Sequence, residues 1–149
     1  MTTVPDQESS PSPTLEEMSR RECLDLMGSL AVGRVAVAQS DSPPLVVPVN
    51  YVVEDETVVF RSDPGSKLSA LRDHPISFQV DVIDPSHRRG WSVLVHGMAH
   101  EMAPGEVGRV ALDSWAGGLK QHWVRIVSSA IRGRRIRLAE IQRDPRGYL

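Results

Sequence analysis

Three segments rich in β-branched residues, separated only by short polar turns, constrain the fold of this chain more than any other feature. They are residues 34–38, 45–53 and 57–60, and the gaps between them contain Asp-Ser-Pro-Pro (41–44) and Glu-Asp-Glu (54–56). β-branched side chains favour extended strands, and such short gaps accommodate a hairpin turn but no helical crossover. The segments therefore predict consecutive antiparallel strands.

Three later segments have the same strand character. Residues 76–83, 91–101 and 123–127 bring the expected number of strands to about six, and a basic stretch with several arginines follows the last one. A run of strands with few helices favours a barrel or a sandwich. We therefore expect a mainly β protein with short helices.

Three short helices are expected between and before these strands. Thr14 and Glu17 form a capping-box pattern, and the apolar residues that follow fall on one helical face up to Gly28. Residues 66–73 predict a second helix, and residues 104–115 a third. Cys23 lies on the buried face of the first helix, which favours an inert core thiol.

The composition is that of a single soluble domain. The chain has 149 residues, 40% hydrophobic and 24% charged, with a formal net charge of −2. This charge gives no reason to expect nucleic acid as a partner. One cysteine cannot form an internal disulfide, and neither a membrane-spanning run nor a secretory signal is visible. We expect a cytoplasmic protein with a disordered tail over residues 1–13 and one domain over 14–149.

The segment from residue 61 to residue 68 is the strongest candidate for a binding site. A strand ends, a Pro-Gly turn follows, and a helix opens at Ser66 with Lys67 in its first turn. Free amides at a helix N-terminus attract anions, and Arg61 and Lys67 would add two positive charges. Phosphate would suit this arrangement. By spacing alone, a simple N-cap at Ser66 with a solvated Lys67 is the more common structure.

The order of several motifs resembles a known superfamily. Val-Val-Pro-Val-Asn-Tyr (46–51), Phe-Arg-Ser (60–62), Gly-Ser-Lys-Leu (65–68) and Trp-Ser-Val-Leu-Val-His-Gly (91–97) follow one another as in the FMN-binding split-barrel superfamily. That superfamily includes pyridoxamine 5′-phosphate oxidase and many small actinobacterial relatives. The resemblance spans roughly residues 15–136. It implies a six-stranded antiparallel split β-barrel and a homodimer with FMN between the subunits.

The resemblance also assigns roles to individual residues. It implies that one strand lies along the flavin ring and contributes backbone contacts, namely Val47, Pro48, Val49 and Asn50. Arg61 and Ser62 match residues beside the ribityl-phosphate, and Ser66 and Lys67 match residues that hold the phosphate. Trp91 and Ser92 would approach the same groove from the other subunit. A flat apolar wall with a few polar groups is also what a buried flavin ring requires.

The sequence departs from the oxidase itself at its C-terminal end. The segment Gly-Arg-Arg-Ile-Arg-Leu (133–138) is basic, but it does not match the arginine and histidine segment that binds pyridoxal phosphate in that enzyme. We therefore expect a flavin-dependent oxidoreductase with an unknown small-molecule substrate, and no catalytic residue stands out.

Two alternatives remain for the function. The first is a flavin or haem carrier or sensor without turnover. The second is a reductase that uses a deazaflavin coenzyme, for which Arg34, Arg88 and Arg89 are the candidate contacts to the acidic tail. Arginines such as Arg88 and Arg89 are more commonly solvent-exposed residues of a loop without a binding role.

The five histidines suggest neither a metal site nor a catalytic base. His96 and His100 would chelate a metal on a helix, but on a strand they lie about 13 Å apart. His74 precedes a proline, His87 lies in a polar loop and His122 stands beside a tryptophan. None is paired with a nucleophile or carboxylate at a recognised spacing.

Overall fold

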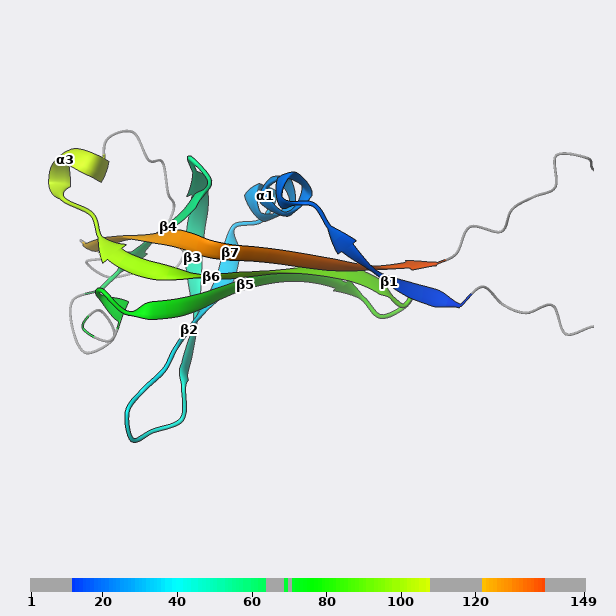
Figure 1. Cartoon of the computed structure of the whole chain (residues 1–149), viewed down its shortest axis with the longest axis horizontal. Coiled ribbons are helices and arrows are strands. Elements are labelled where there is room, and N and C mark those ends of the chain that lie inside the picture. Colours follow the sequence, from blue (N-terminus) through cyan, green and yellow to red (C-terminus); the bar gives the residue numbers. More distant parts are fainter. Residues whose placement is uncertain (1–11, 64–68, 70, 108–121, 139–149) are drawn as a thin grey trace, which may run out of the picture.

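The computed structural model describes residues 12–63, 69, 71–107 and 122–138 (Figure 1). Its elements, in chain order, are β1 (Pro13–Met18), α1 (Arg20–Gly28), β2 (Val32–Val37), β3 (Leu45–Glu54), β4 (Thr57–Ser62), β5 (Pro75–Asp84), β6 (Arg89–Glu101), α3 (Pro104–Val107) and β7 (His122–Leu138).

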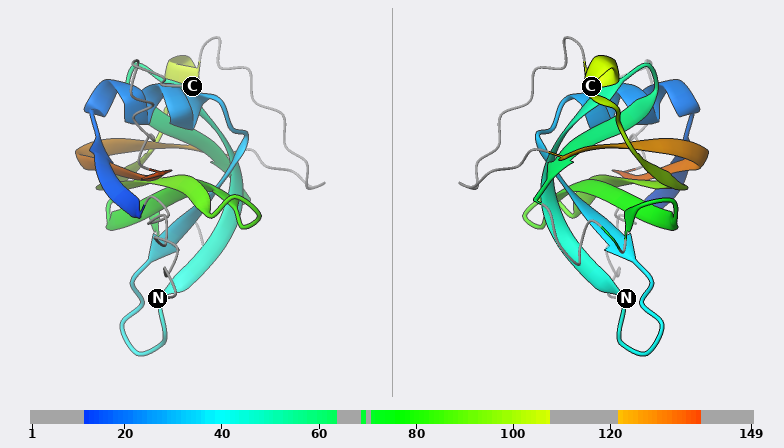
Figure 2. Two further views of the ribbon diagram at one scale, coloured as in Figure 1. Left: turned by 90° about the vertical axis from the view of Figure 1, so that its right-hand side faces the viewer. Right: turned by 90° about the vertical axis from the view of Figure 1, so that its left-hand side faces the viewer.

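Six of the strands close into an antiparallel barrel (Figure 2). The sheet order is β7-β4-β3-β2-β5-β6, and β6 pairs with β7 to complete the ring. Short turns produce the β2–β3, β3–β4 and β5–β6 hairpins, as the polar gaps in the sequence predict. The prediction of a six-stranded antiparallel barrel is confirmed. The strand β1, which pairs with the second half of β7 and is not part of the closed ring, was not predicted.

The predicted start of the first helix is wrong. Thr14 and Glu17 lie in β1, and the capping box is formed instead by Ser19 and Glu22. The Glu22 amide donates to Ser19 Oγ (3.2 Å), and the Ser19 amide donates to the Glu22 carboxylate (2.8 Å). Both patterns have the required spacing, but pairing with β7 holds the first one extended. The helix ends at Gly28, as predicted.

The last strand continues well beyond its predicted end at Val127. The basic segment pairs with β1 and β6, and its arginines meet carboxylates from two elements. Arg135 forms ion pairs with Glu16 and Glu22, and Arg137 Nε lies 2.6 Å from the Glu16 carboxylate. Strand pairing and charge pairing thus extend a segment that contains few apolar residues.

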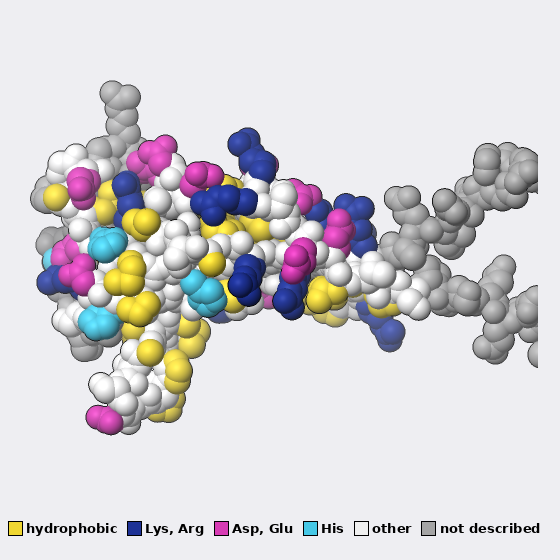
Figure 3. Space-filling model, in the orientation of Figure 1, with side chains coloured by type: hydrophobic (Ala, Val, Ile, Leu, Met, Phe, Trp, Pro, Cys, Tyr) yellow, Lys and Arg dark blue, Asp and Glu magenta, His cyan; other side chains and the backbone are white. Residues whose placement is uncertain are grey.

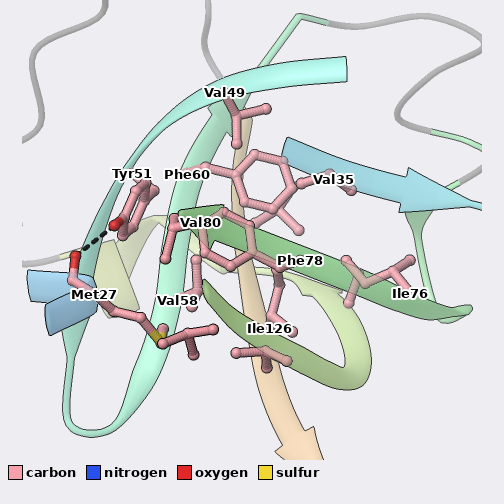
Figure 4. Packing of buried hydrophobic residues seen from close by; sticks show 14 of the residues in the cluster. Met27, Val35, Val49, Tyr51, Val58, Phe60, Ile76, Phe78, Val80 and Ile126 are labelled. Carbon is pink, nitrogen blue, oxygen red and sulfur yellow. Dashed lines mark hydrogen bonds between the residues drawn. The ribbon is translucent and has the colours of Figure 1, made fainter. Parts of the chain in front are cut away.

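The core fills the barrel interior with alternate residues of each strand (Figure 4). Tyr51 and Phe78 form an edge-to-face pair with ring centroids 4.8 Å apart. The Tyr51 hydroxyl donates a hydrogen bond to the Met27 carbonyl, which fastens α1 to β3. Cys23 is fully buried, as predicted, and burial raises the pKa of its thiol. Aromatic packing and this hydrogen bond therefore fix the position of α1.

Several predicted segments lie partly or wholly outside the described residues. Of the predicted helix 66–73, Ser69 and Leu71 are helical, and Leu71 is buried. Of the predicted helix 104–115, the described part is α3. Pro13, which the prediction placed in the tail, begins β1. No helix among the described residues is long and apolar enough to span a bilayer.

Candidate functional site

The β2–β3 hairpin projects from the barrel, and β3 changes its pairing along its length (Figure 1). Leu45 to Asn50 pair with β2, whereas the described pairs with β4 begin at Tyr51. Over residues 45–49, one edge of β3 therefore has no strand partner among the described residues. This edge includes Val47, Pro48 and Val49, three of the residues expected to contribute backbone contacts to a flavin ring.

The side chains of the predicted ring-binding strand alternate between the two faces of the barrel. Val49 is buried and Val47 packs against the core, so both point inward. Pro48 and Asn50 therefore point outward, since neighbouring residues of a strand face opposite sides. The Asn50 amide group donates to the carbonyl of Ala31 (3.4 Å). The outer surface of this strand thus presents the apolar pyrrolidine ring of Pro48 and the side-chain amide of Asn50.

The side chains of Arg61 and Ser62 also point to opposite faces of the barrel wall. The guanidinium carbon of Arg61 lies 5.1 Å from the ring centroid of Trp123, its direct neighbour on β7. Ser62 has no exposed surface, and its hydroxyl donates to the carbonyl of Asp63 (3.2 Å). Arg61 is thus presented on the outer face, while the Ser62 hydroxyl is used within the protein. Ser66 and Lys67 lie outside the described residues.

Trp91 and Ser92 lie far from Arg61 in the same chain. Trp91 is paired with Arg135 and Arg61 with Trp123, twelve residues apart on β7. At about 3.3 Å per residue, this separation is about 40 Å along the strand. Trp91 packs against the core and lines a shallow groove with Val82, Asp84, Arg89, Gly90, Arg135 and Ile136. One chain therefore does not bring all the predicted site residues together.

A charged cluster near Arg61 was not predicted from the sequence. The Glu101 carboxylate accepts one hydrogen bond from His122 Nδ1 and lies 2.5 Å from the guanidinium of Arg72. His122 stands directly opposite Ser62 on β4. The hydrogen bond from His122, and then the charge of Arg72, lower the pKa of Glu101. Only the strand register brings these residues together, so no sequence spacing could have indicated the cluster.

The strand assignment of the two spaced histidines is confirmed. His96 and His100 lie on β6, and their Nδ1 atoms contact different partners, Ser77 Oγ (2.8 Å) and the Asp73 carboxylate (3.3 Å). Among the described residues, no group of three or more His, Cys, Asp or Glu side chains could hold a metal ion.

Comparison with known proteins places this barrel in a family. The family model described as pyridoxamine 5′-phosphate oxidase matches residues 19–141. The chain belongs to the pyridoxamine 5′-phosphate oxidase family. Its barrel is accordingly a split barrel of that family, as the resemblance implied. Membership of a family or fold does not by itself assign a substrate.

Similar proteins come from several bacteria. The structure of the FAD binding protein from Mycobacterium smegmatis is 34% identical, with a TM-score of 0.66, and the match covers 83% of this chain and 100% of that one. A FAD-binding protein from Mesorhizobium loti is 25% identical, with a TM-score of 0.67 and coverage of 85% and 99%. An uncharacterized protein of Mycobacterium tuberculosis is 33% identical over 129 residues, covering 80% of this chain and 84% of its own length.

Proposed function

We propose that this protein is a homodimeric flavin-binding protein that acts as an oxidoreductase on a small molecule. The observation that carries the proposal is the edge of β3 over residues 45–49, which has no strand partner among the described residues and runs toward Arg61. An unpaired strand edge offers amide and carbonyl groups in a flat row, and the guanidinium offers a charge for phosphate. The two similar proteins named for FAD binding support a flavin as the ligand.

The residues present fit the two parts of a flavin nucleotide. Pro48 and the 59% exposed Val46 form an apolar outer surface on β3, against which a planar ring can lie. Backbone groups on the unpaired edge can meet the polar rim of the ring. Arg61 can meet the phosphate, together with Ser66 and Lys67, whose role remains a prediction. Few polar groups on an apolar wall are typical of cofactor sites.

A second copy of the chain supplies the rest of the proposed site. Because Trp91 and Ser92 lie about 40 Å along β7 from the position of Arg61, they can only join a flavin held by another protomer. The barrel also exposes large apolar side chains that a partner would cover, and Figure 3 shows apolar side chains at the surface of one face. They are Val46, Val82, Ile83, Met98, Val127 and Ile136.

Bound flavin would supply the redox chemistry, and the chain's residues would bind and orient it. We assign no catalytic residue. Among the flavins, the sequence resemblance favours FMN, and the proposed contacts to ring and phosphate apply equally to the FMN portion of FAD. Arg61 would carry the phosphate charge, and β3 would set the orientation of the ring.

The absorption spectrum of the purified protein tests the proposal. We expect a flavin spectrum, or its appearance when FMN or FAD is added, and mass spectrometry of the released cofactor identifies which flavin is bound. Bleaching by a reduced nicotinamide donor supports an oxidoreductase, whereas a stable flavin colour supports a carrier. A Soret band, or a colourless protein that binds neither FMN nor FAD, would refute flavin binding.

A further inference from the structure

A row of outward-facing residues crosses the barrel between the projecting hairpin and β7. Val46 stands opposite Ala36, Ala36 opposite Ser77, and Ser77 opposite His96, which in turn faces Ala130. Directly paired residues of antiparallel strands project from the same face. His96 and Ser77 are therefore the polar centre of a row that is apolar at both ends.

The ring of His96 is held in one orientation. Its Nδ1 atom lies 2.8 Å from Ser77 Oγ, and the Ser129 hydroxyl donates to the His96 carbonyl (3.2 Å). A hydrogen bond at one ring nitrogen fixes the ring and leaves the other nitrogen for a ligand. The His96 side chain is exposed, so Nε2 is the atom offered to the outside.

A shallow groove of about 270 Å³ surrounds this pair. Besides Ser77 and His96, it is lined by Ala36, Ala38, Pro75, Ile76, Gly97, Met98 and Ser129. Small and apolar residues without Asp, Glu, Lys or Arg suit a flat uncharged ring and offer nothing to a phosphate. Two hydroxyls and an imidazole can still orient the polar edge of such a ring.

His96 lies far from Arg61 of the same chain. His96 is paired with Ala130, seven residues along β7 from Trp123, the neighbour of Arg61. That is about 23 Å along the strand, before the width of the intervening strand is added. His96 shares its face of β6 with Ser92, which the sequence resemblance assigns to the partner's flavin.

We propose that His96, oriented by Ser77, donates a hydrogen bond from Nε2 to the polar edge of the flavin ring bound by the other protomer. This inference rests on the proposed flavin binding and adds a pair of residues to it. If the Ser77 hydroxyl donates to Nδ1, the ring proton resides on Nε2, where it faces the ligand. Ser77 is then a positioning residue, and His96 is the residue in contact with the cofactor.

Flavin titrations of single variants test the contact. We expect His96→Ala and His96→Gln to weaken FMN or FAD binding about fivefold, and Ser77→Ala to weaken it less, because a hydrogen bond contributes about 1 kcal/mol. His87→Ala is the matched control, since His87 is exposed in the β5–β6 loop and bonded to Asp84. Circular dichroism checks that each variant is folded. Unchanged affinity in both His96 variants would overturn the inference.

A mixed dimer tests whether the contact is made across the interface. Coexpressed His96→Ala and Arg61→Ala chains with different tags allow the heterodimer to be purified. If the contact crosses the interface, one site combines Arg61 of the His96→Ala chain with His96 of the Arg61→Ala chain and is unaltered. One flavin per dimer should then bind with wild-type affinity. If His96 acts within its own chain, both sites are impaired and the inference is wrong. A wild-type protein that binds neither FMN nor FAD would refute the proposed function itself, together with this inference.

Discussion

The guanidinium group of Arg61 on β4 lies over the indole ring of Trp123 on β7, 5.1 Å from the ring centroid. Both side chains project from the outer face of the barrel, where the two strands pair directly. A cation held against an aromatic face loses little further freedom when it binds an anion. Trp123 therefore helps to present Arg61 to the phosphate of the proposed flavin.

Replacing Trp123 should weaken binding of the phosphate end of the ligand. We expect Trp123→Leu to reduce FMN affinity about two- to thirtyfold, because cation–π contacts contribute about 0.5–2 kcal/mol, whereas Trp123→Phe should retain part of the effect. Riboflavin lacks the phosphate and serves as the matched ligand in fluorescence titrations. An equal loss of riboflavin affinity in Trp123→Leu would argue against a role through Arg61.

The hydrogen bond from Tyr51 to the Met27 carbonyl should stabilise the fold measurably. Removing the hydroxyl leaves a buried carbonyl without its partner, so Tyr51→Phe should lower the free energy of unfolding by about 1–3 kcal/mol at neutral pH. Urea denaturation followed by circular dichroism measures this difference. Equal stability of the two proteins would mean that α1 is held by apolar packing alone.

The same pair should produce a distinct response to alkaline pH. Burial raises the pKa of Tyr51 to about 12, above the ordinary tyrosine value of 10. The stability from the neutral hydroxyl is thus fully present below pH 10 and is lost as the pH rises toward 12. The difference in unfolding free energy between wild type and Tyr51→Phe should therefore shrink across this window, and a constant difference would contradict the assignment.

The strands from β2 to β6 could be predicted because their signals are local. Alternating apolar residues and polar turns mark residues 45–53, 76–83 and 91–101, and the structure extends these segments by only one or two residues. By contrast, β1 and the second half of β7 consist largely of charged and polar residues. Their strand structure depends on each other and on β6, so it cannot be read from either segment alone.

The sequence proposes residues for the candidate site but not their arrangement. Arg61 and the β3 segment could be proposed because the order of the motifs is visible in the sequence itself. The partners of these residues depend on register: Trp123 meets Arg61, and Ser77 meets His96, only when the strands pair. His96 has no partner at a recognised spacing in the sequence, so its pairing with Ser77 could not be predicted.

The cluster around Glu101 should make the protein sensitive to acid. The pKa of Glu101 is lowered by its hydrogen bond with His122 and by Arg72, so its stabilising effect is present above the ordinary glutamate value of 4.5 and is lost as the pH falls through the lowered value. Glu101→Gln should destabilise the protein near pH 7 and reduce the dependence of stability on pH below about 5. Denaturation series at several pH values measure both effects, with Glu17→Gln on the exposed strand β1 as the control. Parallel pH profiles for wild type and Glu101→Gln would exclude this role.

Gly97, next to His96 on β6, occupies a position where the paired strand β7 leaves no room for a side chain. A Cβ at this position would lie 2.2 Å from the carbonyl oxygen of Val127, at the point where the β6–β7 register shifts. The backbone of β7 cannot move aside as a flexible side chain can. Gly97→Ala should therefore lower the free energy of unfolding by about 1–3 kcal/mol. Gly28→Ala is the matched control, since nothing lies within 4 Å of a Cβ there and alanine favours the last turn of α1.

The same substitution should also disturb the groove, because a shift in β6 that relieves the contact changes the geometry of the neighbouring His96–Ser77 hydrogen bond. Flavin affinity of Gly97→Ala should therefore fall under conditions in which the variant is still folded, while Gly28→Ala should bind like wild type. Near-ultraviolet circular dichroism establishes folding, and fluorescence titration gives the affinity. A folded Gly97→Ala protein with wild-type affinity would show that the register shift beside His96 has no part in flavin binding.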